Sequence, residues 1–346
     1  MKGADVAVAR NPLQTAALLI AVLLAVALVS TLAPPALQRT ITEALVKLVV
    51  VIGLYVFVGN SGVFSFGHIA FMAIGGYTSA VLTIAPMKKA VALDLPLWLE
   101  TLQLPVIAAA PIAILGAGLL ALLIAWPFVR LRGIALPMAT FALLVIVHVV
   151  ALNWQQVTGG RQALVGLPRT TGLWTAFAAA AAALVVAALY DRTRHGLALR
   201  CSRESEVAAA ATGIDVEGER LIAFVVSAMV VAAGGLLYAH FLGTMTANTF
   251  YLDLTFVTLT MLVVGGMRSL TGACAGVALV SVTSELFRGI ERGVDLGGFV
   301  LSAPPGLQEI ALALILLVIL IMRPHGIVGD WELHWPKRAI EETKGD

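Results

Sequence analysis

Residues 192–220 read RTRHGLALRCSRESEVAAAATGIDVEGER and lie between two long apolar runs of the chain. The segment is charged and rich in helix-forming residues, whereas the runs beside it carry almost no charge. A membrane protein whose other connections are mostly short has little reason to keep such a segment unless a partner outside the bilayer binds it. We therefore predict that this segment is the docking site for a cytosolic motor.

The composition predicts a membrane protein built of helices. Hydrophobic residues make up 60% of the chain, charged residues only 12%, and the mean hydropathy is +0.97. A soluble domain carries about 25% charged residues. Several runs approach or exceed the roughly 18 apolar residues that a bilayer-spanning helix needs. We therefore predict an all-α fold, a polytopic transmembrane helical bundle.

The apolar runs divide the chain into ten predicted crossings. They are residues 13–33, 42–59, 65–85, 104–127, 134–152, 173–190, 220–242, 252–267, 272–288 and 306–322. The third is rich in glycine and polar residues, and the eighth is short. For both of these crossings the sequence leaves open whether the helix is continuous or broken. The first run is too long for a signal-peptide core, so we expect an uncleaved span. The sequence predicts one transmembrane domain over residues 1–346, with a cytoplasmic loop at 191–219 and a short cytoplasmic tail at 323–346.

The distribution of basic residues predicts the orientation. With ten crossings, both termini lie on one side, and that side holds 14 of the 22 lysines and arginines, while the other side holds 7. Cytoplasmic loops carry the excess of lysine and arginine. Both termini and the 192–220 segment are therefore predicted to be cytoplasmic. The remaining basic residue, Lys47, lies inside the second span, four residues after Glu43, so we expect a local ion pair.

The sequence gives no sign of an enzyme. It has no G-x-x-x-x-G-K-[ST] loop for ATP phosphates, no H-E-x-x-H zinc motif and no G-x-S-x-G turn. The six histidines are scattered, and the two cysteines, Cys201 and Cys274, imply no disulfide framework. The net charge of +2 implies no nucleic-acid partner. We expect no catalytic residue, metal site or cofactor in this chain.

A second motif interleaves polar side chains, glycines and aromatics at bilayer depth, from Asn60 to Tyr77. Glycines let a helix break and turn polar groups toward a cavity, or let two backbones approach closely. The segment therefore lies beside a translocation path, or its glycines are packing notches and its polar side chains bond the neighbouring backbone. The candidates for the path are Asn60, Ser61, Ser65, Gly67, His68, Phe71 and Tyr77. For Gly265, Gly272 and Gly276, farther along the chain, we expect close helix packing.

Five stretches of the sequence together resemble one known family. They are residues 65–77, residues 132–160, residues 196–214, residues 264–272 and residues 323–327. In this order they resemble the permeases of bacterial branched-chain amino acid ABC importers, specifically the larger of the two membrane subunits. The chain departs from the common pattern at 161–163, where Arg-Gln-Ala replaces small or acidic residues followed by glycine, and at Met267 and Arg268.

The resemblance implies a role for the charged segment and a set of partners. The segment looks like the loop by which ABC importers couple to their ATPase. The implied coupling residues are Arg203, Glu204, Glu206, Ala208, Ala209 and Gly213. The implied partners are a second homologous permease, two cytosolic ATPase subunits that bind ATP and Mg, and a periplasmic substrate-binding protein, in a bacterial inner membrane.

The implied solutes are branched-chain amino acids or related small amino acids and amides. The residues leave an alternative open, a stand-alone secondary transporter of a small polar solute that is driven by an ion gradient. That transporter would work through Glu285, the Glu43–Lys47 pair and His68, because carboxylates and histidines within spans serve as proton or ion sites.

Overall fold

The computed structural model describes residues 12–292, 294–295, 300–301, 304, 306–323 and 325–334. Lys2, Arg10 and the tail from residue 335 onward, which contribute to the predicted orientation, lie outside the described residues, as does Pro324 of the fifth stretch. The described part is almost entirely helical. Its long helices are α1 Pro12–Ser30, α2 Pro35–Leu54, α3 His68–Thr83, α6 Val106–Phe128, α7 Ala135–Asn153, α9 Leu173–Arg192, α12 Val216–Leu242, α13 Leu252–Gly265, α14 Leu270–Arg292 and α15 Leu307–Met322.

Shorter elements connect the long helices. They are the π-helix η1 Tyr55–Gly59, α4 Pro86–Ala92, α5 Leu97–Glu100, α8 Gln155–Thr158, α10 Arg194–Glu204, α11 Glu206–Ala211 and the 3-10 helix η2 Ala247–Phe250. Two antiparallel pairs of two-residue strands complete the described part, β1 Leu164–Val165 with β2 Thr244–Met245 and β3 Val294–Asp295 with β4 Val300–Leu301.

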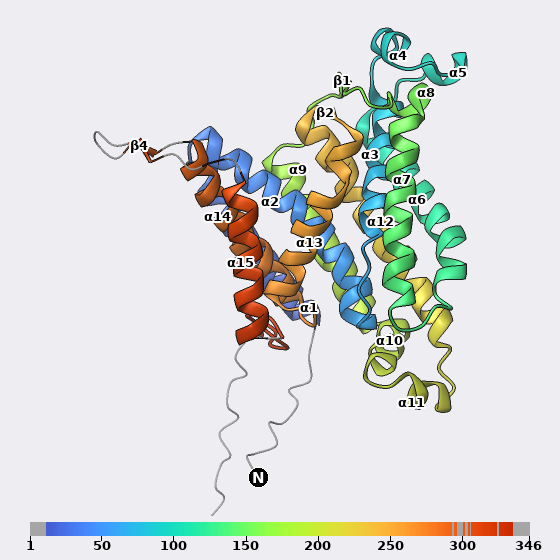
Figure 1. Ribbon diagram of the computed structural model, residues 1–346, viewed down its shortest axis with the longest axis vertical. Coiled ribbons are helices and arrows are strands. Elements are labelled where there is room, and N and C mark those ends of the chain that lie inside the picture. The colour runs from blue at the N-terminus through green and yellow to red at the C-terminus, as the bar shows by residue number, and fades with distance from the viewer. Residues whose placement is uncertain are drawn as a thin grey trace, which may run out of the picture.

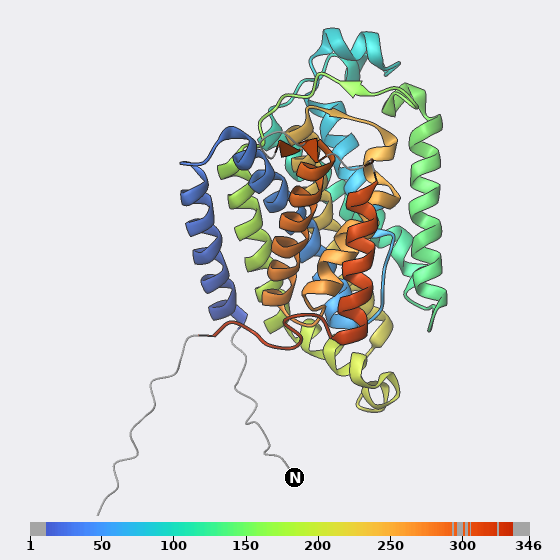
Figure 2. The same ribbon diagram turned by 60° about the vertical axis from the view of Figure 1, so that its left-hand side comes forward.

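Each of the ten predicted crossings overlaps one of these helices. Within the described residues, eight helices are long and apolar enough to cross a membrane, and the shorter α3 and the 310–319 part of α15 are apolar as well. The long helices lie side by side (Figures 1 and 2), with α4 and α5 at one end of the molecule and α10 and α11 at the other. The prediction of a polytopic helical bundle is confirmed.

Helix α12 lies at the centre of the bundle, where it packs against α3, α6 and α2. Aromatic side chains fill part of this contact, because Phe224 of α12 meets Phe57 and Phe71 in edge-to-face geometry at centroid distances of 5.3 and 5.6 Å. Edge-to-face pairs stabilise a core beyond the area that they bury. The core therefore sits along α12, and α2 and α3 are fixed to it.

The third predicted crossing is only partly helical. The helix begins at His68, and residues 62–67 before it are not helical. Gly62, with φ of +72°, ends the preceding helix in a conformation that favours glycine. The amide of Phe66 in this non-helical segment donates to the hydroxyl oxygen of Thr140 on α7 at 3.2 Å. Non-helical backbone at membrane depth persists where such protein partners satisfy it.

The glycines of α13 and α14 allow the closest helix contact in this region. A Cβ atom on Gly276 would lie 1.8 Å from the carbonyl oxygen of Met261, and one on Gly265 would lie 1.9 Å from that of Gly272. No side chain fits at such distances, so the two backbones touch. The close packing predicted for these glycines is confirmed. The short turn at residues 266–269 joins the two helices and lies near the charged segment.

Candidate functional site

The charged segment folds into two short helices, α10 and α11, between the spans α9 and α12. Because α9 continues to Arg192 and α12 begins at Val216, the part of the segment between these two helices covers residues 193–215, inside the predicted loop at 191–219. Helix α11 contains three of the predicted coupling residues, Glu206, Ala208 and Ala209. In Figure 1 it stands out from the end of the molecule, beyond the ends of the long helices.

Local sequence signals fix both ends of α11. At its start, the hydroxyl oxygen of Ser205 accepts a hydrogen bond from the amide of Ala208 at 3.2 Å, which caps the helix. At its end, the amide of Ile214 donates to the carbonyl of Ala209 and that of Gly213 to the carbonyl of Ala210. This pair of bonds is the Schellman arrangement, which needs a left-handed residue, and Gly213 has φ of +85°. A six-residue helix therefore keeps a defined shape here.

The predicted coupling residues divide into an exposed group and an inward group. Glu204, Glu206, Ala208 and Gly213 are exposed, Ala209 is buried, and Arg203 is half-buried. Val207, in the same helix, is 82% exposed. The outer face of α11 thus presents small apolar side chains to the surroundings, while Ala209 and Arg203 attach the segment to the bundle.

Glu206 is tied to the bundle by an ion pair. Its Oε1 atom accepts a hydrogen bond from the guanidinium of Arg220, near the start of α12, and the Arg220 side chain is only 4% exposed. Nearby, Nδ1 of His195 lies 2.8 Å from Oε2 of Glu219. Charge-assisted bonds of this kind are the strong ones in proteins. Glu206 therefore holds α11 against α12, in addition to any contact that it makes outside the chain.

Arg203 connects the same segment to the end of η1. Its Nη1 atom donates to the carbonyl oxygen of Gly59 at 2.6 Å, and its Nη2 atom lies 3.3 Å from Oε1 of Glu204. The guanidinium of Arg200, one turn earlier in α10, donates to the backbone carbonyl of Asp191. Arg200 and Arg203 of α10 thus attach the charged segment to the end of α9 and to the end of η1.

Asp191 is buried at the end of α9 and joins that helix to η1 and to the residue that directly follows η1. Its Oδ2 atom accepts a hydrogen bond from the Tyr55 hydroxyl at 2.8 Å, and its Oδ1 atom accepts one from Nδ2 of Asn60 at 3.1 Å. Single π-helical turns occur frequently at functional sites. Here the π-helix turns both Tyr55 and Asn60 toward the same carboxylate.

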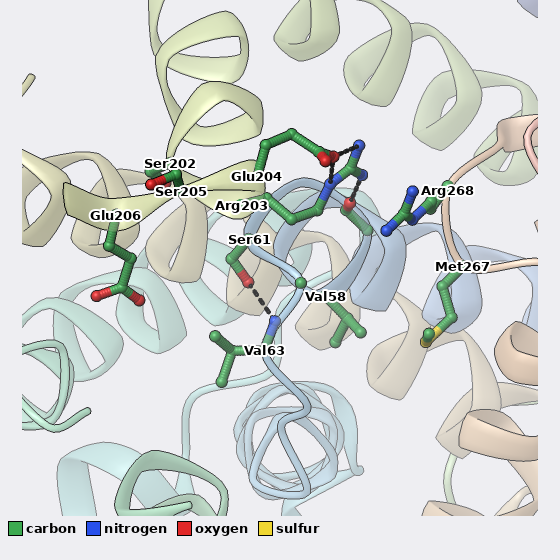
Figure 3. A pocket seen from close by; sticks show the side chains of 12 residues that line it. Val58, Ser61, Val63, Ser202, Arg203, Glu204, Ser205, Glu206, Met267 and Arg268 are labelled. Carbon is green, nitrogen blue, oxygen red and sulfur yellow. Dashed lines mark hydrogen bonds and ion pairs between the residues drawn. The ribbon is translucent and has the colours of Figure 1, made fainter. Parts of the chain in front are cut away.

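A cavity of about 360 Å³ lies where these segments meet (Figure 3). Three stretches of chain line it, the end of the second span and the turn after it, the α10–α11 junction, and the turn between α13 and α14. The lining residues are Val58, Gly59, Ser61, Gly62, Val63, Ser202, Arg203, Glu204, Ser205, Glu206, Met267 and Arg268. The structure therefore brings one residue of the predicted path, Ser61, together with three of the predicted coupling residues.

The other candidates for the path are buried in the helical bundle and do not line this cavity. His68 is fully buried; its Nδ1 atom lies 2.7 Å from the Ser65 hydroxyl, and its Nε2 atom has no hydrogen-bond partner among the described residues. Phe71 is buried against Phe224. These contacts are those expected of the packing alternative.

Two further candidates of this group are also enclosed. A Cβ atom on Gly67 would lie 2.6 Å from the carbonyl oxygen of Thr140, and Tyr77 is buried with its ring 6.3 Å from that of Phe250.

Among the described residues, no group of three or more His, Cys, Asp or Glu side chains is arranged to hold a metal ion.

A separate cluster of charges lies between α2 and α14. The predicted Glu43–Lys47 ion pair is confirmed, with Oε1 and Nζ 2.7 Å apart. The hydroxyl of Thr40 donates to Oε2 of Glu285 at 3.3 Å, and that oxygen lies 3.9 Å from Nη1 of Arg288. The structure thus brings together the carboxylates and the lysine that the secondary-transporter alternative needs, but His68 does not contact them.

The chain after α15 folds back onto the turn between α13 and α14. Amides of Ile327 and Val328 donate to carbonyls of Val264 and Gly265. The carboxylate of Glu332 accepts hydrogen bonds from the amide and hydroxyl of Thr271 and from the preceding amide, at the start of α14. Burial raises the pKa of the Glu332 carboxyl above its usual value, and the hydrogen bonds oppose that shift.

Several residues of this region were not predicted from the sequence. Asp191, Tyr55 and Arg220 complete the contacts of the charged segment, and Met267 and Arg268 line the cavity. One signal was visible, because Asp191 is a carboxylate that directly follows the apolar run of α9. The pairing of Arg220 with Glu206 had no such signal, since it depends on how the chain turns at Gly213.

Comparison with known proteins agrees with these features. The family model described as branched-chain amino acid transport system permease component matches residues 36–322. The high-affinity branched-chain amino acid transport system permease proteins LivM of Escherichia coli and Salmonella typhimurium are each 26% identical over 323 residues, covering 83% of this chain and 68% of the relative.

A shorter match involves a probable branched-chain amino acid transport permease protein LivH of Methanocaldococcus jannaschii. It is 31% identical over 147 residues, which are 42% of this chain and 44% of that relative. No solved structure matches the chain. On the extent of the family match, this multi-pass membrane protein belongs to the family of branched-chain amino acid ABC transport permeases.

Proposed function

We propose that the chain is the transmembrane permease subunit of an ATP-driven importer for branched-chain amino acids or related small amino acids and amides. It forms half of the translocation path, together with a second homologous permease. Two cytosolic ATPase subunits bind ATP and Mg, and a periplasmic binding protein delivers the solute. The location is a bacterial inner membrane, with both termini and the loop at 191–219 in the cytoplasm.

The observation that carries the proposal is the shape and exposure of α11. It is capped at both ends, and its outer face of alanines and valine extends beyond the bundle. A rigid, small apolar face fits a hydrophobic groove on a partner. Because Glu206 and Arg203 bind α12 and the end of η1, a displacement of α11 by the ATPase reaches the spans directly.

The test changes the docking helix without changing the spans. Replacing Gly213 with Trp forces a bulky residue into a left-handed conformation at the exposed end of α11, and Glu206→Ala removes the tie to Arg220. In proteoliposomes that hold the complete importer, we expect the double variant to lose ATP-dependent uptake by about tenfold or more, because left-handed backbone and a lost ion pair each cost over 1 kcal/mol.

Gly133→Trp is the matched control. Gly133 also has a positive φ, of +59°, and open space around it, but it lies outside the charged segment. Equal loss of uptake in both variants, or normal coupling in the double variant with full membrane insertion, would count against docking through α11.

The cluster between α2 and α14 favours the second candidate function, a secondary transporter. Four charged groups and a threonine hydroxyl meet there within two spans. Charged side chains inside spans are functional candidates by default. Uptake by the purified chain alone in liposomes, dependent on a proton or sodium gradient and lost in Glu285→Gln, would establish that function in place of the importer.

A further inference from the structure

Residues 62–67 form an extended segment that runs lengthwise along the long helices. In Figures 1 and 2 it follows the second span as a blue trace without helical turns, between α13 and α7. Its two ends have different surroundings. Gly62 and Val63 line the cavity at the α10–α11 junction, whereas His68, just after the other end, is fully buried. The segment therefore leads from that cavity into the interior of the bundle.

One side of the segment is attached to α7 and α3. The amide of Phe66 donates to the hydroxyl oxygen of Thr140, and the Phe66 ring meets that of Phe141 edge-to-face at a centroid distance of 6.1 Å. The hydroxyl of Ser65, a buried residue, lies 2.7 Å from Nδ1 of His68. These contacts hold the segment in place and fix which of its groups turn away from the chain.

The other side of the segment is not covered by this chain. Gly62 is exposed, and Phe64 is 38% exposed. Within the described residues, the carbonyls of Gly62 and Val63 and the amide of Phe64 have no hydrogen-bond partner. Unpaired backbone groups are costly in hydrocarbon, so non-helical backbone at membrane depth persists only where protein covers it or water reaches it. Lipid therefore does not cover this side of the segment.

The adjoining cavity favours water over a dry protein contact. Its volume of about 360 Å³ holds several water molecules, and charged side chains of Arg203, Glu204 and Arg268 are part of its lining. Charged groups are costly to remove from water, so such a space is hydrated. Because Gly62 and Val63 belong to the same lining, this water reaches the start of the uncovered side of the segment.

We propose that residues 62–64 form a water-accessible wall of the translocation path, with the side chain of Phe64 facing the solute. The proposal rests on the proposed function, which supplies the second permease as the opposite wall. Arg203 of the charged segment touches this wall, because a Cβ atom on Gly62 would lie 2.6 Å from the Cγ atom of Arg203. A displacement of the charged segment therefore moves the wall of the path.

The test is the reaction of an introduced thiol with the anionic reagent 2-sulfonatoethyl methanethiosulfonate, in the complete importer in nanodiscs without the binding protein. The reactive form of a thiol is the thiolate, which apolar surroundings suppress. We expect Phe64→Cys to react at least about tenfold faster than Leu123→Cys, at a site that is 63% exposed on the regular helix α6 and therefore suited to lipid. Met87→Cys, in α4 and at a site 84% exposed, is the positive control. Mass spectrometry of each modified peptide measures the rate at that position alone.

The same modification tests whether the wall belongs to the path. The native Cys201 is exposed in the charged segment, so this experiment uses the Cys201→Ser background. We expect the reagent, which attaches a bulky sulfonate, to remove most of the ATP-dependent uptake of the Phe64→Cys chain. The Leu123→Cys chain should keep its uptake under the same treatment.

Two results overturn the proposal. Equally slow reaction of Phe64→Cys and Leu123→Cys would mean that the partner permease covers Phe64 in a dry contact. Full uptake after complete modification of Phe64→Cys would mean that the solute passes elsewhere.

Uptake by the unsubstituted complex separates this inference from the proposed function. ATP-dependent uptake together with an unreactive position 64 sinks the inference and leaves the importer standing. A reactive position 64 whose modification blocks an uptake driven by an ion gradient, in a complex that does not use ATP, supports the wall and sinks the importer.

Discussion

The guanidinium of Arg203 donates a hydrogen bond of 2.6 Å to the carbonyl oxygen of Gly59, 144 residues earlier in the chain. Arg203 ends α10 in the charged segment, and Gly59 ends the π-helix that continues the second span. The bond is a direct link from the candidate docking segment to the backbone of the second span, and the bond from Arg200 to the carbonyl of Asp191 is the corresponding link to α9. A force on the segment is therefore transmitted to the second span close to its end, just before the non-helical run at 62–67.

Arg203→Gln is expected to weaken this connection. A hydrogen bond from a charged donor is worth about 1.5–3 kcal/mol, so the balance between coupled and uncoupled positions of α10 shifts by about tenfold or more. ATP hydrolysis by the reconstituted importer should then respond about tenfold less to its loaded binding protein. Arg132→Gln, an exposed arginine at the same end of the molecule, is the control and should behave as wild type.

The buried carboxylate of Asp191 gives a prediction about stability. Tyr55→Phe and Asn60→Ala each remove one hydrogen bond to it, and each should lower the free energy of unfolding by about 1.5–3 kcal/mol. Because both act on one carboxylate, their effects should not add in a double-mutant cycle. Thermal unfolding in detergent measures these values.

Tyr77→Phe is the control for that cycle. The Tyr77 hydroxyl is buried without a hydrogen-bond partner among the described residues, so its removal should be neutral or stabilising. Equal losses in Tyr55→Phe and Tyr77→Phe would mean that the hydrogen bond to Asp191 contributes nothing specific.

The glycine contact of α13 and α14 predicts opposite effects for two identical substitutions. Gly276→Ala places a methyl group 1.8 Å from the carbonyl oxygen of Met261, so the helices must separate and stability should fall by about 1–3 kcal/mol or more. Gly116→Ala, in α6, has open space around it and should stabilise the helix by up to about 1 kcal/mol. A Gly276→Ala variant as stable as wild type would contradict the packing.

The fold-back of the tail should depend on pH through Glu332. Burial raises the pKa of this carboxyl in the folded state, so docking favours the protonated form. The docking free energy is therefore fully present below the ordinary glutamate pKa and decreases as the pH rises through the raised value. Hydrogen exchange of the amides at 270–271 and 327–328, corrected for intrinsic rates, measures this dependence.

Two variants check the assignment to Glu332. Glu332→Gln should remove the pH dependence, and Asp330→Asn, whose carboxylate lies 3.8 Å from Arg268 in an exposed pair, should retain it. Protection that increases with pH in the wild-type chain would show that the hydrogen bonds from Leu270 and Thr271 outweigh burial.

Element positions followed from the sequence because their causes are local. A run of apolar residues long enough to cross a bilayer satisfies its backbone only as a helix, so the ten predicted ranges coincide with helices. The Glu43–Lys47 pair follows from a spacing of four residues on one helix, and Ser205 and Gly213 mark the ends of α11 by their own side-chain chemistry and backbone freedom.

The third crossing shows the limit of such reasoning. Its composition allowed either a continuous or a broken helix, and in the non-helical run at 62–67 the amide of Phe66 donates to the hydroxyl oxygen of Thr140, a residue of the distant helix α7. His68, just after this run, looked equally suited to a path or to packing, and its ring packs against that of Phe224 in α12, which lies more than 150 residues away in the chain.

The sequence by itself determined the membrane-spanning helices, the charged segment between α9 and α12 and the caps of its short helix, because each rests on neighbouring residues and on the solvent that surrounds them. Only the tertiary structure decided that Gly59, Arg203 and Arg268 meet around one cavity, and that Glu206 pairs with Arg220. Those contacts join segments that are distant in the chain, and their formation depends on how the helices pack, which no local pattern of residues encodes.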